Sequence, residues 1–189
     1  MKAVAASDST ARTRILDAAR ARMLEAGESG ASSAQVAAAA GVSKALVHYH
    51  FRDKRELLLG VTTACGERIA ARAGVTTDAA SPLDAFWQWL ERELNAGDLR
   101  LLVQLTQGDD DAVGEAAVGE LRVFRVETQR RVRRVFRALA LTPSISAELV
   151  TELVMVAAMG LAAGDEAMSE GAGRQAMDVL WLALLGLGA

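Results

Sequence analysis

The stretch GVSKALVHYHFRDKRELL, residues 41–58, decides how this chain folds. Gly41 ends a preceding helix, and Ser43 caps a new helix that we expect to run to about His50. Val47 and Phe51 fall four residues apart on one face of that helix, which indicates that this face packs against neighbouring helices. The opposite face carries Lys44, Ala45, His48 and Tyr49, with Leu46 at its edge.

Two further helices are expected before this stretch. The first covers about residues 9–26, where apolar residues recur at helical spacing, and it ends at Gly27. The second is short, because Ser32 and Gln35 form a capping box and Gly41 follows soon after. Two short helices joined by a glycine-containing turn, behind a longer helix, predict a helix-turn-helix.

The outward face of the third helix has the chemistry of a DNA-binding surface. Lys44 and Tyr49 can reach phosphates or base edges, and a small alanine lets the backbone approach the groove floor. Leu46 can contact a thymine methyl group. A fourth helix begins near Asp53, and Lys54 in its first turn adds a charge beside free backbone N–H groups. This face therefore predicts contact with a polyanion.

A metal site or a catalytic site is the alternative interpretation of the histidines. His48 and His50 are two residues apart, so they point in different directions on a helix, and no cysteine is near them in the sequence. Cys65 is the only cysteine, and no Gly-x-Ser-x-Gly motif is present. We expect no metal, no cofactor and no enzymatic activity; an all-α enzyme stays as the remote alternative.

Composition and charge favour a basic head on a larger helical body. Of the 189 residues, 51% are hydrophobic and only two are prolines, which favours helices. Residues 1–55 carry nine Lys or Arg and five Asp or Glu, a net charge of +4, whereas residues 56–189 carry −7. A single cysteine, no apolar leader and no apolar run longer than 11 residues predict a cytoplasmic protein without a membrane span.

The segments ILDAARARMLEAG and SSAQVAAAAGVSKALVHYHFRDKRELLLGV resemble the N-terminal domain of the TetR family of bacterial transcription regulators, over residues 12–61. The resemblance implies an all-α homodimer whose first three helices bind a palindromic double-stranded DNA operator. It also implies a repressor that a small-molecule effector releases. By the same resemblance the DNA-facing residues are Ser32, Ser33, Lys44, Ala45, Leu46, His48, Tyr49 and Lys54.

Some positions depart from the family pattern. His48 replaces a usual tyrosine, so a phosphate contact made by its imidazole would depend on pH. Glu28 replaces an aromatic residue, Ser33 an aliphatic one and Arg22 an apolar one. These changes leave fewer apolar side chains for the small core of the head. Because a fold alone does not establish ligand sensing, a dimeric DNA-binding or adaptor protein without a small ligand stays open.

The body is expected to add six helices to the three of the head. We divide the chain into a helix-turn-helix DNA-binding domain at 1–55 and a helical regulatory and dimerisation domain at 56–189. Acidic, glycine-rich segments at 108–114 and 164–173 are expected to be surface loops. Of the five helices after the fourth, the first begins at Pro82. The others cover about residues 98–107, 115–140, 144–163 and 173–187.

One apolar stripe of the body has a single polar member, Thr128. Its hydroxyl either bonds back to Phe124 in its own helix or is the polar group of a ligand pocket. Arg122 or Arg125 could also reach inward to an anionic ligand, although we expect most arginines between 122 and 137 to be solvated or paired. The expected lining of the pocket is Trp87, Leu90, Leu94, Phe124, Thr128, Met155 and Met159.

The last two helices carry apolar faces at the end of an otherwise polar chain. Two such helices from each of two subunits would form a four-helix interface, while burial inside one subunit is the alternative. The residues expected at the interface are Leu149, Leu153, Val156, Gly160, Met177, Leu180, Trp181 and Leu184.

Overall fold

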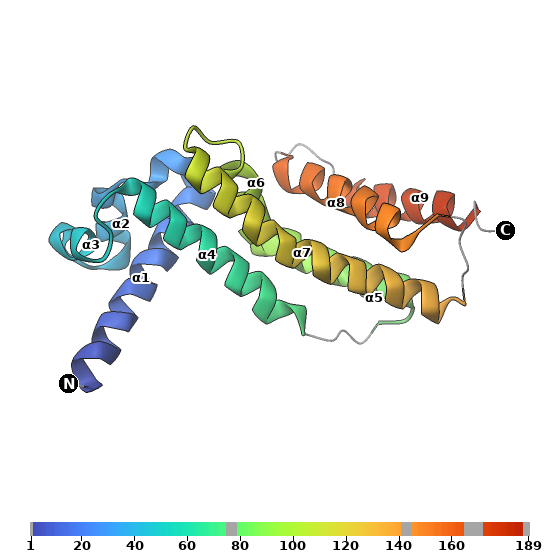
Figure 1. The fold of residues 1–189 in the computed structure, drawn as a ribbon, viewed down its shortest axis with the longest axis horizontal. Helices are drawn as coiled ribbons and strands as arrows, with labels where there is room; N and C mark the ends of the chain where they lie inside the picture. The colour runs from blue at the N-terminus through green and yellow to red at the C-terminus, as the bar shows by residue number, and fades with distance from the viewer. Residues whose placement is uncertain (1, 75–78, 141–144, 165–171, 187–189) are drawn as a thin grey trace.

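The computed structural model describes residues 2–74, 79–140, 145–164 and 172–186, with backbone alone for 2–9, 172 and 184–186 (Figure 1). Across these ranges the elements are helices, no strand is present, and no helix is long and apolar enough to cross a membrane. The predicted all-α fold is confirmed. The elements are α1 (Lys2–Ala26), η1 (Gly27–Ala31), α2 (Ser33–Ala40), α3 (Lys44–His50), α4 (Lys54–Ala73), α5 (Pro82–Ala96), α6 (Asp98–Leu105), α7 (Asp111–Ala138), α8 (Ala147–Ala163) and α9 (Ala172–Gly186).

The caps predicted for the helix-turn-helix are present. The Ser32 hydroxyl accepts a hydrogen bond from the Gln35 backbone N–H at 3.4 Å, and Ser43 accepts from the Leu46 N–H at 3.1 Å. Gly41, which ends α2, has φ of 63°, a left-handed conformation that glycine adopts without strain. The left-handed Gly41 and the Ser43 cap therefore set the turn between α2 and α3.

Several features differ from the prediction, among them the start of α1, which lies at Lys2 rather than near residue 9. Residues 111–114 belong to α7 rather than to a loop, because the Asp110 carboxylate accepts from the backbone N–H groups of Ala112 and Val113 and starts the helix early. Between α1 and α2 the chain forms the short 3₁₀ helix η1, which was not predicted. A Cβ on Gly30 in η1 would lie 2.3 Å from the Arg22 carbonyl oxygen, so this turn requires glycine.

The head and the α8–α9 pair lie at opposite ends of an elongated molecule (Figure 1). Helix α4 leads from the head into the body and packs along α7. In the centre of the body Trp89 stacks on Phe124, with ring centroids 5.2 Å apart and an interplanar angle of 18°. Phe86 meets Trp181 edge-on at 5.3 Å, which fixes α9 to α5.

Buried charges join the head to the body. Asp98, in the first turn of α6, is fully buried and accepts a hydrogen bond from Arg20 Nε of α1 at 2.6 Å. A second cation, Arg72 of α4, lies 2.8 Å from Asp98 and also pairs with the buried Glu93 of α5 at 2.8 Å. The cluster Arg20–Asp98–Arg72–Glu93 thus ties α1, α4, α5 and α6 together at one point.

Candidate nucleic-acid interface

Helix α3 presents opposite chemistry on its two sides. Val47 and Phe51 are buried, and the Phe51 ring lies under the Arg12 guanidinium of α1 at 5.2 Å. Tyr49 is 72% exposed, the most exposed large hydrophobic side chain in the described part of the chain. The side chains of Lys44, Ala45 and His48 are also exposed, and Leu46 is half-buried, as expected at the edge of the face.

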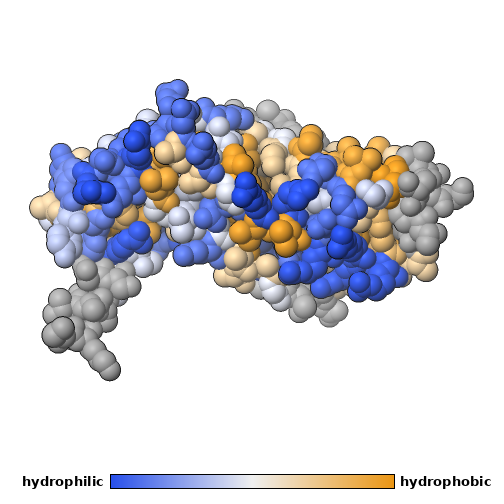
Figure 2. Space-filling view, viewed as in Figure 1, coloured by the Kyte–Doolittle hydropathy of each residue, from blue (hydrophilic) through white to orange (hydrophobic). Residues whose placement is uncertain are grey.

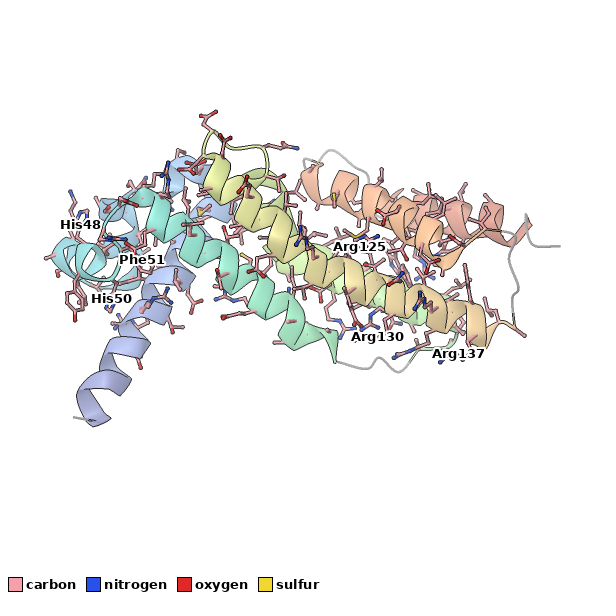
Figure 3. All side chains as sticks on the ribbon, in the orientation of Figure 1. His48, His50, Phe51, Arg125, Arg130 and Arg137 are labelled. Atoms are coloured by element: carbon pink, nitrogen blue, oxygen red, sulfur yellow. The ribbon has the colours of Figure 1, made fainter. Side chains whose placement is uncertain are left out.

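The histidines lie on different sides of α3 (Figure 3). His50 is half-buried and meets the Tyr49 ring edge-on, with centroids 5.2 Å apart. His48 is exposed on the outward face with Lys44. Only His48 of the two is therefore placed to meet a partner of this face.

Lys54, the residue predicted to contact a DNA phosphate, forms an ion pair within the chain. Its Nζ lies 2.6 Å from the Glu28 carboxylate of η1, and both side chains are about half exposed. The neighbouring Arg55 donates to Asp110, the N-cap of α7, at 2.5 Å, and this hydrogen bond lowers the pKa of the Asp110 carboxyl. Sequence reasoning noted Glu28 as unusual, yet it could not find these pairs because each joins elements distant in the sequence.

Residues 15–61 match the family model of bacterial regulatory proteins of the tetR family. Over these residues the chain is similar to the tetR family. Members of this family are transcription regulators rather than enzymes, in agreement with the prediction from the sequence. No curated protein matches the chain.

Solved structures of TetR-family proteins and of transcriptional regulators share the fold. A TetR-family regulator from Agrobacterium tumefaciens has a TM-score of 0.73 at 16% identity, covering 96% of this chain and 100% of that chain. A transcriptional regulator from Saccharomonospora viridis in complex with choline has 0.69 at 17%, covering 91% and 95%. FadR from Bacillus subtilis in complex with stearoyl-CoA has 0.66 at 14%, covering 92% and 98%. At these identities the likeness establishes the fold alone.

The predicted ligand-pocket residues differ in how far they are buried. Leu90, Phe124, Thr128 and Met155 are buried, whereas Trp87, Leu94 and Met159 are partly buried. The Thr128 hydroxyl donates to the Phe124 carbonyl at 2.8 Å, the helix-internal bond that was one of its two expected roles. The ring against Phe124 is that of Trp89, which was not predicted for the pocket. The Arg131 guanidinium also lies over the Trp89 ring, 4.7 Å from its centroid.

The predicted interface residues divide between surface and interior. Leu149, Leu153 and Val156 of α8 are exposed, by 71% in the case of Val156, and Gly160 is exposed as well. Met177 and Trp181 are buried within the chain, Leu180 is partly buried, and the Leu184 side chain lies outside the described residues. Apolar side chains gather over α8 in Figure 2. The sequence pattern missed two exposed apolar residues of α9, Val179 and Leu182.

The arginines of α7 mostly pair with glutamates. Arg125 lies against Glu152 and Arg133 against Glu148, both on α8, and Arg131 is buried beside Glu127 of its own helix at 3.0 Å. Figure 3 shows Arg125, Arg130 and Arg137 spread along the helix, and Figure 2 shows the strongly hydrophilic surface of its C-terminal half. The expectation that most of these arginines are solvated or paired agrees with these contacts.

Proposed function

We propose that this protein is a homodimeric TetR-family repressor, with a DNA-binding domain at residues 1–55 and a regulatory domain at 56–189. It would bind a palindromic operator through α2 and α3, and a small molecule would release it. The observation that carries this proposal is the outward face of α3, where Lys44, His48 and the 72%-exposed Tyr49 project from a helix held by Val47 and Phe51.

Lys54 gives the DNA-binding proposal its sharpest test. Binding is measured by fluorescence anisotropy between 50 and 200 mM salt on a duplex enriched from a random library, with a scrambled duplex beside it. Lys54→Ala should weaken binding to both duplexes alike and lower the salt slope by about one for each phosphate that the lysine neutralises. Arg125→Ala, which alters a cation of the body, is the matched control. An unchanged affinity of Lys54→Ala would refute the phosphate assignment.

Tyr49 and the serines of α2 test sequence reading separately. Tyr49→Ala should change the preference between the enriched and the scrambled duplex, because base contacts specify and phosphate contacts position. Ser33→Ala, by contrast, should weaken both complexes equally. A Tyr49→Ala protein with unchanged preference would remove Tyr49 from the base-reading set.

The exposed apolar face of α8 and α9 supports the homodimer. Leu153, Val156 and Leu180 line an apolar hollow of about 330 Å³ between these helices, which a second copy would cover. Val156→Asp should yield monomers in sedimentation, and Val126→Asp places the same change on a 54%-exposed valine of α7 as a control. A dimer that persists in Val156→Asp would place the interface elsewhere. In the dimer the two recognition helices should lie about 34–36 Å apart, one turn of DNA.

The alternative, a DNA-binding protein whose body only dimerises, is favoured by one observation. Thr128, the polar group of the predicted pocket, already donates to Phe124, and the Trp89 ring stacks on Phe124. A repressor with an effector needs a site for that effector, and the Thr128 stripe supplies weak support for one. The relatives bound to choline and to stearoyl-CoA are the reason to retain ligand release in the proposal.

A further inference from the structure

A hollow of about 350 Å³ lies where the head, the turn between α5 and α6, and the end of α8 meet. Leu24 of α1, Leu94 of α5 and Leu161 of α8 supply apolar walls, and Arg100 of α6 supplies a cation. These elements are far apart in the sequence, so the hollow exists only in the folded chain. It is distinct from the predicted pocket at Thr128, with whose expected lining it shares Leu94 alone.

Arg100 is a cation without an acidic partner among the described residues. Its Nη2 donates to the Leu24 carbonyl oxygen at 2.8 Å, whereas its Nε is shielded from solvent and has no hydrogen-bond acceptor there. The neighbouring cations Arg20 and Arg72 differ, because each pairs with Asp98. A shielded N–H donor without an acceptor is unfavourable, and a bound anion would satisfy it.

The lining defines the chemical class of the ligand. A guanidinium presents paired N–H donors that match the two oxygens of a carboxylate, and leucine walls accept an apolar chain. Arg100 is the one cation among the described lining residues, which favours one negative charge, and Arg20 of α1 is held by Asp98 and by the Ala96 carbonyl. The volume is near the lower end of the roughly 300–1,000 Å³ usual for small-molecule sites, so the ligand is small.

We propose that this hollow binds a small organic acid, with its carboxylate on Arg100 and its apolar part between Leu24, Leu94 and Leu161. The regulatory consequence, unlike the binding itself, rests on the proposed repressor function. Arg100 is also the residue that holds the Leu24 carbonyl near the end of α1. A ligand carboxylate competes with that carbonyl for the guanidinium, and so it favours a different position of the head relative to α6.

The α5–α6 turn makes this joint sensitive to small displacements. Gly97 has φ of 80°, and a Cβ at this position would lie 2.9 Å from Cδ2 of Leu24, so the turn and α1 are in close contact. A ligand wedged between Leu24 and Leu94 acts directly on this contact. The hollow is thereby placed to couple an acid in the body to the orientation of the head.

The binding test uses the full chain without DNA, and the probe is sodium octanoate measured by calorimetry. Octanamide keeps the chain length and removes the charge, so it should bind about tenfold to a hundredfold more weakly. Octyl phosphate distinguishes the head groups. Tighter binding of octyl phosphate than of octanoate would overturn the carboxylate assignment, and equal binding of octanoate and octanamide would overturn the role of Arg100.

Variants locate the site. Arg100→Gln should abolish octanoate binding, and Arg122→Gln, which changes an arginine on the surface of α7, should leave it unchanged. Asn95 lies at the rim of the hollow and is exposed, so its substitution does not disturb the core. Asn95→Glu should weaken octanoate binding and Asn95→Lys should strengthen it, with octanamide unaffected in both. If the affinity for octanoate were the same in both variants as in the wild type, the ligand would have to bind elsewhere.

The regulatory step has a separate readout. Anisotropy on the enriched duplex should show that octanoate weakens DNA binding by the wild-type protein and leaves that of Arg100→Gln unchanged. Octanoate that binds through Arg100 without altering DNA affinity would refute the coupling to the head. A protein that binds no duplex would refute the proposed function, and calorimetry would still decide whether the acid site exists.

Discussion

Replacing Asp98 by asparagine removes the carboxylate that holds Arg20 of the head to α6. Asp98 is fully buried, accepts from Arg20 Nε at 2.6 Å and lies 2.8 Å from Arg72 Nη1. Asparagine has nearly the same shape, so the change leaves packing intact and alters charge. Arg72 keeps Glu93 as a partner at 2.8 Å, whereas Arg20 keeps the Ala96 carbonyl, which carries no full charge.

The magnitude follows from burial. Breaking a buried pair by removing one partner costs about 3–5 kcal/mol, because a charge is left uncompensated in a poorly solvated place. The side chains of Arg20 and Arg72 are 20% and 23% exposed, so water offsets part of this cost and the lower figure, about 3 kcal/mol, applies. For a chain of this size each kcal/mol lowers Tm by roughly 2–4 °C, which gives a fall of about 6–12 °C.

Urea unfolding at one fixed protein concentration measures this destabilisation, since the stability of the proposed dimer would depend on concentration. Glu152→Gln is the control, because it breaks a pair with Arg125 in which both side chains are about half exposed. Exposed pairs contribute about 0–1 kcal/mol, so this control should unfold almost as the wild type does. If Asp98→Asn were no less stable than Glu152→Gln, the argument that buried charge joins the head to the body would be wrong.

Four further expectations follow from named contacts and from burial. Glu28→Gln should strengthen binding to any duplex several-fold, because Lys54 no longer needs to leave a carboxylate, and the gain should vanish in a Lys54→Ala background. Burial raises the pKa of the Cys65 thiol to about 12, so a thiol reagent at pH 8 should label it only on unfolding. Since the unfolded thiol titrates near 8.5, the free energy of unfolding should be unaffected by this group below that pH and should fall as pH rises from about 9 towards 12. Gly30→Ala should destabilise the head by about 1–3 kcal/mol in thermal unfolding, because its methyl group would clash with the Arg22 carbonyl.

The head was predictable because its signals are local. Ser32 and Ser43 cap helices within three residues of themselves, and Val47 and Phe51 mark the buried face of α3 by spacing alone. The 3₁₀ helix η1 escaped prediction because its need for Gly30 arises from the carbonyl of Arg22, eight positions earlier. The early start of α7 depended on an Asp110 cap inside a segment whose acidic composition suggested a loop.

The body was predictable only as far as periodicity reaches. An apolar stripe shows that a helix has a buried face, but it does not show which neighbour covers that face. Met177 and Trp181 were themselves expected at a subunit interface, and they are buried against the chain's own core. Trp87 was selected because it lies at helical spacing from Leu90 and Leu94, whereas the ring that stacks on Phe124 is that of the buried Trp89.

The ion pairs of this protein differ in solvation, and that difference determines what each can do. Lys54–Glu28 lies half exposed at the edge that would meet DNA, so a phosphate can replace the carboxylate at little cost. The Arg20–Asp98 pair is buried. If a ligand replaced one partner, the other would be left as a buried charge without a counter-charge. Arg100 fits neither case, because it is shielded like the second pair yet has no carboxylate among the described residues. An anion that enters from solvent therefore gains the most binding free energy at Arg100, the residue of α6 that bonds to the end of α1.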